Sequence, residues 1–305
     1  MSQIVFILYT RRSPEVFEMN STFFGLPSSI NVFHMGSDRL IHENILFSDF
    51  EKLFTTNGHD VVPVYDFREA GGMSIGGFAQ TSEYGIVFVD RYNNCLRIYN
   101  RLQGTVKKLA GFCDNKYSGF RDGTDALFYA PVTVIQDNQD PCLLYVIDSG
   151  NRALRMVTKT HIPHVTTLIK NDHKTYRDLT QEPEGRYLYI TFFEGVERYD
   201  LVTNTSRDIV SNITRYTNDA LMYDGQFNGI ILLENWLIIA DSSGHVLLVV
   251  DLTNNTASTI CTGEAGHHSG NASFCKLKHP TTLLELNGDI YIGGEGYISV
   301  LRGTT

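Results

Sequence analysis

The sequence predicts an all-β protein built from repeated four-stranded antiparallel sheets. Thr105–Val157 supports this most clearly, because it holds four apolar runs of strand length that are rich in Val, Ile, Leu and Tyr. Turn residues separate the runs and no helical spacing joins them, so they indicate one antiparallel sheet. Weaker copies recur at intervals of roughly 50 residues, which is typical of a repeat architecture. The four runs are Val106–Ala110, Val132–Ile135, Leu143–Ile147 and Ala153–Val157.

The motifs within this stretch carry a family resemblance. In chain order they read GFRDG, ALFYAP, LYVIDSGN and ALRMV. This order resembles the NHL repeat, which has a DG loop, a small-x-Phe-x-x-Pro strand, an Asp-x-x-Asn hairpin and a last strand. The resemblance implies a β-propeller, a closed ring of four-stranded blades, and short strands repeating at this interval are expected to build the same architecture.

The other copies place most of the blades. GIVFVDRYNNCLRIY aligns with CLLYVIDSGNRALRM, which puts Asp90 over Asp148 and Asn93 over Asn151. Thr191 stands in place of the Asp in the next copy, and Asp241 restores it in the one after. Residues 1–305 are thus predicted to be a single domain. Its predicted blades 2 to 6 are residues 66–112, 120–170, 171–211, 212–262 and 264–305.

The last copy is one strand short. Ile4–Tyr9, within residues 1–12, reads as an isolated strand that would complete the last blade and hide the open sheet edge; a frayed tail is the alternative. The prediction is a six-bladed β-propeller of four-stranded antiparallel blades, closed by an N-terminal strand joining the last blade. A five-bladed ring with an N-terminal extension is the alternative. Residues 14–60 would form a divergent first blade with strands at Ile30–Met35, Arg39–Ile45 and Phe50–Thr55.

Composition narrows the possible partners. Hydrophobic residues make up 42% of the chain, and no apolar run approaches the roughly 18 residues of a membrane helix, so membrane insertion is not expected. The formal charge is -9 and basic residues are not clustered. Nucleic-acid binding depends on clustered Lys and Arg, so this balance argues against a nucleic-acid partner.

The five cysteines show no zinc-binding spacing and favour disulfides. Cys261 and Cys275 flank one loop, and Cys95 opens a strand whose partner strand ends near Cys113. These two pairs are the disulfide candidates, and Cys142 is left over. The alternative is five reduced thiols in a cytosolic core.

Sequons support a secreted or cell-surface protein. Asn204 and Asn254 lie in matching turns, and Asn212 and Asn271 lie between repeats, where a glycan would avoid the core. The first residues have the wrong charge order for a signal peptide, so a secreted chain would be mature or part of a larger extracellular assembly. A cytoplasmic location is the alternative. The glycosylation candidates are Asn20, Asn204, Asn212, Asn254 and Asn271.

No catalytic residue, metal ligand or cofactor site is predicted. Asp90, Asp148 and Asp241 are expected to cap hairpin turns rather than to carry chemistry. Among propellers that the repeat resembles is the peptidylglycine amidating lyase, whose axis resembles a metal-lined channel. His side chains from different blades are the metal ligands there. The corresponding first strands of this chain, SIGGF (74–78), PVTVI (131–135), FNGII (227–231) and PTTLL (280–284), contain no His. Asn228 is the one candidate there for a calcium ligand.

Function is therefore expected at one face of the ring. The loops on that face would present aromatic and Arg side chains, which often dominate binding energy. The prediction is an extracellular interaction module that binds a protein or glycan. The alternatives are a channel-type enzyme, either a lyase or a lactonase-like hydrolase, and a cytosolic NHL scaffold that binds RNA. The predicted binding residues are Arg91, Tyr92, Tyr117, Phe120, Arg152, Phe192 and Phe193.

Overall fold

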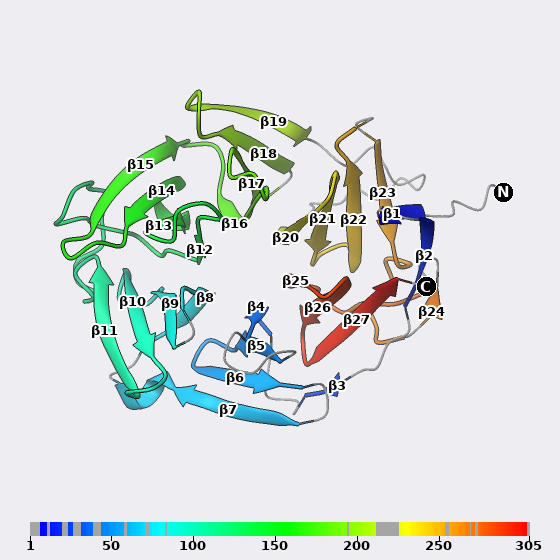
Figure 1. Cartoon of the computed structure of the whole chain (residues 1–305), viewed down its shortest axis with the longest axis horizontal. Helices are drawn as coiled ribbons and strands as arrows, with labels where there is room; N and C mark the ends of the chain where they lie inside the picture. The colour runs from blue at the N-terminus through cyan, green and yellow to red at the C-terminus, as the bar shows by residue number, and fades with distance from the viewer. Residues whose placement is uncertain are drawn as a thin grey trace.

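The computed structural model confirms an all-β ring of six blades, each with four antiparallel strands (Figure 1). Five blades are four-stranded sheets, and the sixth belongs to a sheet that three further strands extend to seven. It describes residues 7–10, 13–19, 24–26, 32–38, 44–57, 60–70, 73–82, 84–193, 195–211, 226–253, 256–268, 270–271 and 274–303. Within these ranges the helices are two short 3-10 turns, η1 (Phe67–Ala70) and η2 (Ser149–Asn151). In this described part, no helix is long and apolar enough to cross a membrane.

Each blade is a simple antiparallel meander. Blade 1 contains β4 (His34–Ser37), β5 (Ile45–Ser48), β6 (Lys52–Thr56) and β7 (Val61–Asp66). Blade 2 contains β8 (Ile75–Gln80), β9 (Gly85–Asp90), β10 (Cys95–Asn100) and β11 (Thr105–Ala110). Blade 3 contains β12 (Thr133–Gln136), β13 (Leu143–Asp148), β14 (Ala153–Thr158) and β15 (His164–Lys170).

The second half of the ring repeats the pattern. Blade 4 contains β16 (Tyr176–Gln181), β17 (Tyr187–Phe192), β18 (Gly195–Asp200) and β19 (Thr205–Ser211). Blade 5 contains β20 (Phe227–Leu233), β21 (Trp236–Asp241), β22 (Val246–Asp251) and β23 (Thr256–Ile260). Blade 6 contains β25 (Thr282–Leu286), β26 (Asp289–Gly294) and β27 (Tyr297–Gly303), and its fourth strand comes from the N-terminal region.

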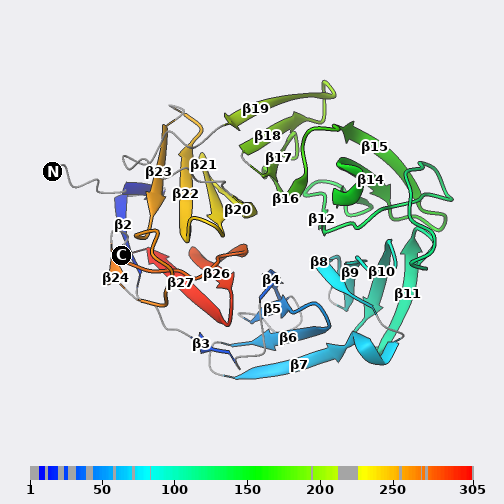
Figure 2. The same ribbon diagram turned by 180° about the vertical axis from the view of Figure 1, so that it is seen from behind.

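The first strand of each blade lies nearest the axis. Figures 1 and 2 show β4, β8, β12, β16, β20 and β25 around the centre of the ring, with later strands of each blade farther out. Each of these inner strands contacts the inner strands of both neighbouring blades, so the ring closes.

The hydrophobic core is divided among the six interfaces between blades. One cluster joins blades 5 and 6 through residues such as Ile238 and Ile292, and another joins blades 2 and 3 through Val89 and Val146. The other four clusters fill the remaining interfaces in the same way. Since each sheet has two apolar faces, a blade buries its hydrophobic residues only by stacking against both neighbours.

Closure by an N-terminal strand is confirmed, but the strand that pairs with the last blade is the one that follows the predicted strand in the chain. β2 (Ser13–Met19) pairs with β27, with Phe17 opposite Gly303 and Glu18 opposite Arg302. β1 (Ile7–Thr10), which overlaps the predicted Ile4–Tyr9, pairs with β2 on its outer side. Two short strands, β3 (Phe24–Gly25) and β24 (Gly270–Asn271), pair with β27 and β2. Both N-terminal strands have strand-forming sequences, so the sequence alone did not show which one meets the last blade.

Blade 1 differs most from its prediction. Its first two strands begin later than Ile30 and Arg39, whereas β6 is close to the predicted Phe50–Thr55. Phe50 lies in the turn between β5 and β6, where the Asp49 carboxylate accepts hydrogen bonds from the amides of Glu51 and Lys52. This Asx turn starts the strand two residues later than predicted. Residues 39–43 lie outside the described part.

Both predicted disulfides are present. Cys95, at the start of β10, is bonded to Cys113, and Cys261, after β23, is bonded to Cys275 ahead of β25. The second bond therefore fastens the connection between blades 5 and 6. Cys142 is a free, exposed thiol.

Candidate functional site

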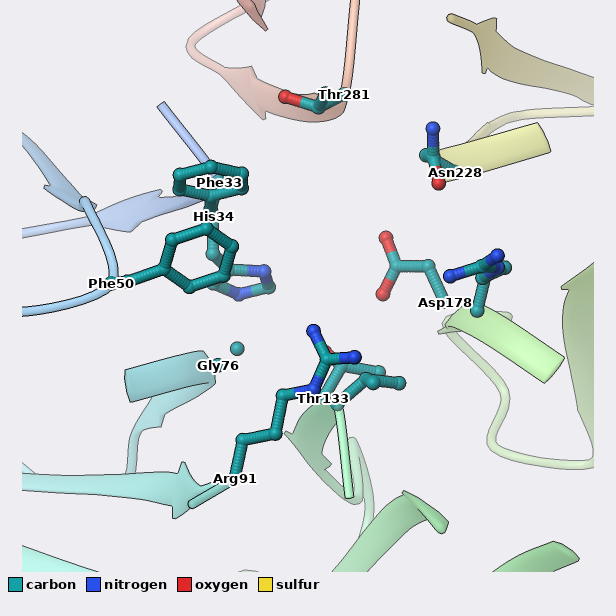
Figure 3. Close-up of a pocket in the computed structure, with 12 residues that line it drawn as sticks. Phe33, His34, Phe50, Gly76, Arg91, Thr133, Asp178, Asn228 and Thr281 are labelled. Carbon is teal, nitrogen blue, oxygen red and sulfur yellow. The ribbon is translucent and has the colours of Figure 1, made fainter. Parts of the chain in front are cut away.

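A pocket of about 220 Å³ lies on the axis of the ring (Figure 3). Every blade lines it with residues at or beside the start of its first strand, such as His34 on β4, Asp178 on β16 and Asn228 on β20. Turns between second and third strands add Phe50 and Arg91. The full lining is Phe33, His34, Phe50, Gly76, Gly77, Arg91, Val132, Thr133, Arg177, Asp178, Asn228 and Thr281.

Glycine lets neighbouring inner strands approach closely at the pocket. The amide of Gly77 donates a 2.6 Å hydrogen bond to the carbonyl oxygen of Val132 in the next blade. A Cβ atom on Gly77 would lie 2.3 Å from the hydroxyl oxygen of Thr133 and 2.8 Å from its Cα. These distances are far inside van der Waals contact, so a side chain on Gly77 would push β8 and β12 apart.

Two arginines bring positive charge to the pocket. Arg91 is exposed and Arg177 is half-buried, and neither guanidinium forms a salt bridge with a described carboxylate. Burial and the positive charge of Arg91 lower the pKa of Arg177. The guanidinium carbon of Arg177 lies 5.5 Å from the centroid of the Phe193 ring, which gives it a cation-π partner. Two like charges therefore face one pocket without a paired anion.

Asp178 is the acidic group of the pocket. Part of its surface is open to the pocket, but protein surrounds it on the other sides, and this burial raises its pKa to about 7. The amides of Leu179 and Ile230 act in the opposite direction, by donating hydrogen bonds to the carboxylate. The hydroxyl of Thr133 lies near the carboxylate, outside good hydrogen-bond geometry. Near neutral pH, Asp178 therefore exists in both protonated and ionised forms.

His34 faces the pocket as a neutral imidazole. Its Nε2 atom lies 3.0 Å from the carbonyl oxygen of Phe78, which can only accept, so Nε2 carries the proton and Nδ1 is unprotonated. Burial lowers the pKa of His34 to about 4, although the bond to Phe78 acts the other way. In Figure 3 the imidazole and the Asp178 carboxylate lie on opposite sides of the pocket, and Arg91 reaches toward the space between them.

An aromatic pair covers the His34 side of the pocket. The rings of Phe33 and Phe50 have centroids 3.6 Å apart and planes inclined by 32°. Phe50 is 39% exposed, which is high for a phenylalanine side chain and leaves apolar surface at the pocket mouth.

Thr191 and Ser242 fix the polar residues of blades 4 and 5. The Thr191 hydroxyl accepts a 3.0 Å hydrogen bond from the amide of Asp178 and donates one of 2.8 Å to the carbonyl oxygen of Asn228. The Asn228 side-chain nitrogen donates to the Ser242 hydroxyl at 2.8 Å. The Asn228 amide oxygen is then the atom left to accept a hydrogen bond from a ligand.

The seven predicted binding residues lie in several turns, loops and strand ends. Arg91 lines the pocket, and Phe193 touches it indirectly by packing under Arg177. Tyr92 and Tyr117 are more than half exposed, and Arg152 is exposed in the turn before β14. Phe120 packs against Arg155 and Lys170, and Phe192 ends β17 beside Lys174. Their roles in binding remain predictions.

The predicted turn caps are confirmed. The Asp148 carboxylate accepts hydrogen bonds from the amide of Tyr129 and the side chain of Asn151, each of 2.8 Å. Asp90 binds Asn93 in the same manner, and Asp241 accepts from the amide of Gly244 at 2.9 Å. These carboxylates hold turns and do not line the pocket.

The described residues limit what the pocket could hold. Within them, no three His, Cys, Asp or Glu side chains gather in an arrangement that could bind a metal ion. The glycosylation candidates Asn20, Asn212 and Asn254 lie outside the described part. Asn204 is exposed in the turn between β18 and β19, and Asn271 lies in β24.

Sequence reasoning missed most of the pocket. His34, Arg177 and Asp178 lie on the first strands of blades 1 and 4, the two copies that match the repeat least well. A signal was present, because each blade has a polar residue or glycine at or beside the start of its first strand. These residues lie in the pairs Phe33-His34, Gly76-Gly77, Val132-Thr133, Arg177-Asp178, Phe227-Asn228 and Thr281-Thr282. Placing the first strands of blades 1 and 4 would have aligned these pairs on the axis.

Comparisons of sequence assign no family. No protein-family model matches the chain, and no curated protein matches it.

Solved structures match the fold. An auxiliary nutrient binding protein from Bacteroides thetaiotaomicron VPI-5482 has a TM-score of 0.68 at 12% identity, over 99% of this chain and 76% of that one. A gluconolactonase from Xanthomonas campestris has a TM-score of 0.65 at 12% identity, over 94% and 91%. A chain of a nidogen/laminin complex has a TM-score of 0.60 at 11% identity, over 82% and 84%. The chain is thus a six-bladed β-propeller with an axial pocket, and the likeness concerns the fold alone.

Proposed function

We propose that this protein is an extracellular, NHL-like binding module whose axial pocket holds a negatively charged group of a small organic ligand or of a glycan. The observation that supports this most directly is the pair of arginines, Arg91 and Arg177, which face the pocket without a carboxylate partner among the described residues. With Asp178 ionised the lining carries a net charge of +1, and with Asp178 protonated it carries +2.

Energetics favour an anion in this position. Like charges that are partly removed from water repel one another, and a carboxylate placed between them relieves that repulsion. Arg is well suited to this role, because its planar guanidinium can donate two parallel hydrogen bonds to one carboxylate. The pocket is positive although the whole chain has a formal charge of -9, so its charge is local.

Two further observations support an extracellular location. Both disulfides belong to oxidising environments, and the Asn204 sequon lies in an exposed turn. Two solved propellers of similar fold are described as auxiliary nutrient binding proteins, which is the same kind of role.

The test is calorimetric titration of the full chain with small carboxylates, phosphates and their neutral analogues. We expect the acids to bind and the neutral analogues not to bind. Arg91→Gln and Arg177→Gln should each weaken acid binding at least tenfold, by removing a charge-assisted hydrogen bond. Arg207→Gln, which removes an exposed arginine from the outer strand β19, outside the pocket lining, is the matched control. Acid binding that survives both pocket substitutions would disprove the proposal.

A second candidate is an enzyme that transfers a proton to or from the bound ligand, either a lyase or a lactonase-like hydrolase. It is favoured by a carboxyl group with a pKa of about 7 opposite an unprotonated imidazole nitrogen. General acid-base catalysis needs such a pair near neutral pH. Incubating the protein with sugar lactones and with oligosaccharides of acidic sugars, followed by NMR, tests it. Turnover that Asp178→Asn abolishes supports the enzyme, and unchanged substrates support the binding module.

A further inference from the structure

The pocket has two chemically different sides. Phe33 and Phe50 offer a flat apolar surface on one side, next to His34, whereas Asp178 lies opposite and Arg91 points between them (Figure 3). A bare inorganic anion would use the arginines and leave the exposed aromatic surface in water. A ligand that uses both sides carries its charge on a body with an apolar face.

The remaining polar groups suit hydroxyl groups. The Asn228 amide oxygen is left to accept a hydrogen bond, since the amide nitrogen already donates to Ser242. Asp178 can accept from a hydroxyl when ionised and donate to one when protonated. The Thr281 hydroxyl donates to the Val32 carbonyl oxygen at 2.6 Å, and its lone pairs can accept from a ligand. Three hydrogen-bonding positions thus surround the space between the aromatic rings and the arginines.

Size restricts the ligand to about one ring. Pockets for drug-sized ligands usually measure roughly 300–1,000 Å³, and this pocket measures about 220 Å³. A single six-membered sugar fits that description, and an oligosaccharide would enter only by its terminal residue.

Resting on the proposed anion-binding function, we infer that the axial pocket recognises a uronic acid, a sugar ring that carries a carboxylate. The carboxylate lies between Arg91 and Arg177, the C–H face of the ring packs on Phe50, and the hydroxyls meet Asn228 and Asp178. A sugar ring has a C–H face and an equatorial set of hydroxyls, so it satisfies the apolar and polar sides together.

Calorimetry on the full chain with four probes tests this assignment. D-glucuronate carries ring, hydroxyls and charge; D-glucose lacks the charge; acetate lacks the ring; benzoate has a flat ring without hydroxyls. We expect D-glucuronate to bind at least tenfold more tightly than each of the others. Equal binding of glucose, acetate or benzoate would overturn the inference, because one of the three features would then be unused.

Two variants separate this inference from the proposed function. Phe50→Leu should weaken D-glucuronate binding roughly three- to tenfold and leave acetate binding unchanged, whereas Arg177→Gln should weaken both. If acetate or phosphate binds through the arginines and D-glucuronate binds no better, the proposed function stands and the uronic acid assignment fails. If no anion binds at all, both fail.

A methyl glucuronide distinguishes the source of the sugar. Methylation blocks the anomeric hydroxyl, as the bond to the next residue does at the end of a glycan. Binding of both free glucuronate and methyl glucuronide points to a terminal glycan residue, and binding of the free sugar alone points to a free acid. Either result keeps the uronic acid as the ligand class, and failure of both excludes it.

Discussion

Arg155 donates a 2.8 Å hydrogen bond from Nη1 to Oδ2 of Asp148, and neither side chain has any exposed surface. The Arg155 guanidinium also lies against the rings of Phe120 and Phe128 and donates to the Asp122 carboxylate at 2.7 Å. One buried cation therefore holds the long loop ahead of β12 against blade 3. The same spacing recurs in blade 2, where Arg97 donates to Asp90 at 2.8 Å.

Breaking this pair should be costly. Arg155→Met leaves Asp148 buried without its cation, and removing one partner of a buried ion pair costs about 3 to 5 kcal/mol. Urea denaturation at pH 8 measures the loss. Burial already raises the pKa of Asp148 to about 6, above its unfolded value, so the carboxyl can protonate at lower pH, and the loss should be smaller at pH 5.

A double variant checks that the two residues act together. Arg155→Met combined with Asp148→Asn removes the unpaired charge and should recover part of the stability. If Arg155→Met alone lies within about 1 kcal/mol of the unmodified protein at pH 8, the pair does not stabilise the blade as stated.

Asp178→Asn should stabilise the protein at neutral and alkaline pH. The folded pKa of Asp178, about 7, lies above the unfolded value, so the folded state keeps a proton that the unfolded state loses, and stability falls as pH rises from about 4 to 7. Asn cannot ionise, so the variant avoids this loss. Its free energy of unfolding at pH 8 should be roughly 2 to 4 kcal/mol higher than that of the unmodified protein. Thermal unfolding at pH 4 and pH 8 measures it.

Asp125→Asn is the control, because Asp125 is exposed and does not line the pocket. It should change the midpoint equally little at both pH values. If Asp178→Asn raises the unfolding midpoint equally at pH 4 and pH 8, the Asp178 carboxyl does not take up a proton on folding as stated.

Anion binding should weaken as pH rises through 7. Protonated Asp178 leaves Arg91 and Arg177 as the charges at the pocket, while His34 is neutral on the facing strand. Ionised Asp178 opposes the ligand, so an acid that binds the protonated form should bind about tenfold more weakly at pH 8 than at pH 6. Calorimetry at the two pH values measures this, and Asp178→Asn should remove the difference. A pH-independent affinity in the unmodified protein would rule out the linkage.

Each disulfide should contribute about 3 kcal/mol to the free energy of unfolding. The bonded cysteines are 18 and 14 residues apart, and closing a loop of this size lowers the conformational entropy of the unfolded chain. The double variants Cys95→Ser/Cys113→Ser and Cys261→Ser/Cys275→Ser test the two bonds by urea denaturation. Cys142→Ser is the matched control and should leave stability unchanged. Thiol titration of the unfolded, unreduced protein should find one thiol per chain, and a count of five would refute both bonds.

Asn204 should carry a glycan when the protein is made in a eukaryotic secretory pathway. It is exposed, with a positive φ of 54° that suits Asn, and its Oδ1 accepts a hydrogen bond from the Tyr199 hydroxyl. The amide nitrogen remains for glycosylation. Asn204→Asp keeps the accepting oxygen and blocks the modification, so its mass before glycosidase treatment should be one glycan lower. Equal masses for the two proteins would exclude a glycan here.

The fold was predictable because its signals are local and repeated. Strands such as β13 and β21 are continuous apolar runs followed by an Asp that caps the next turn, and both features are visible in one stretch of sequence. The two disulfides followed from cysteine positions at the ends of predicted strands, since Cys95 begins β10 and Cys261 directly follows β23. The closing strand was predicted at β1 instead of β2. The pairing of β2 with β27 joins distant parts of the chain, so no local sequence pattern indicates it.

The pocket could not be predicted in the same way. In blade 4 the turn-capping Asp is replaced by Thr191, which made this copy look degenerate. The structure shows that the shorter hydroxyl bonds the backbones of Asp178 and Asn228 and so positions two pocket residues. Departure from the repeat thus coincides with the candidate site, where local rules are expected to give way to function.

The pairing of β2 with β27 also bears on how the molecule is made. The strands of blades 1 to 5 are synthesised after β2 and before β27, so β2 has no partner strand in the last blade while those blades are made. Contacts between distant segments form slowly, and an unpaired sheet edge can accept a strand from another nascent chain. Correct assembly of the ring therefore requires that β2 stay unengaged until its partner has left the ribosome.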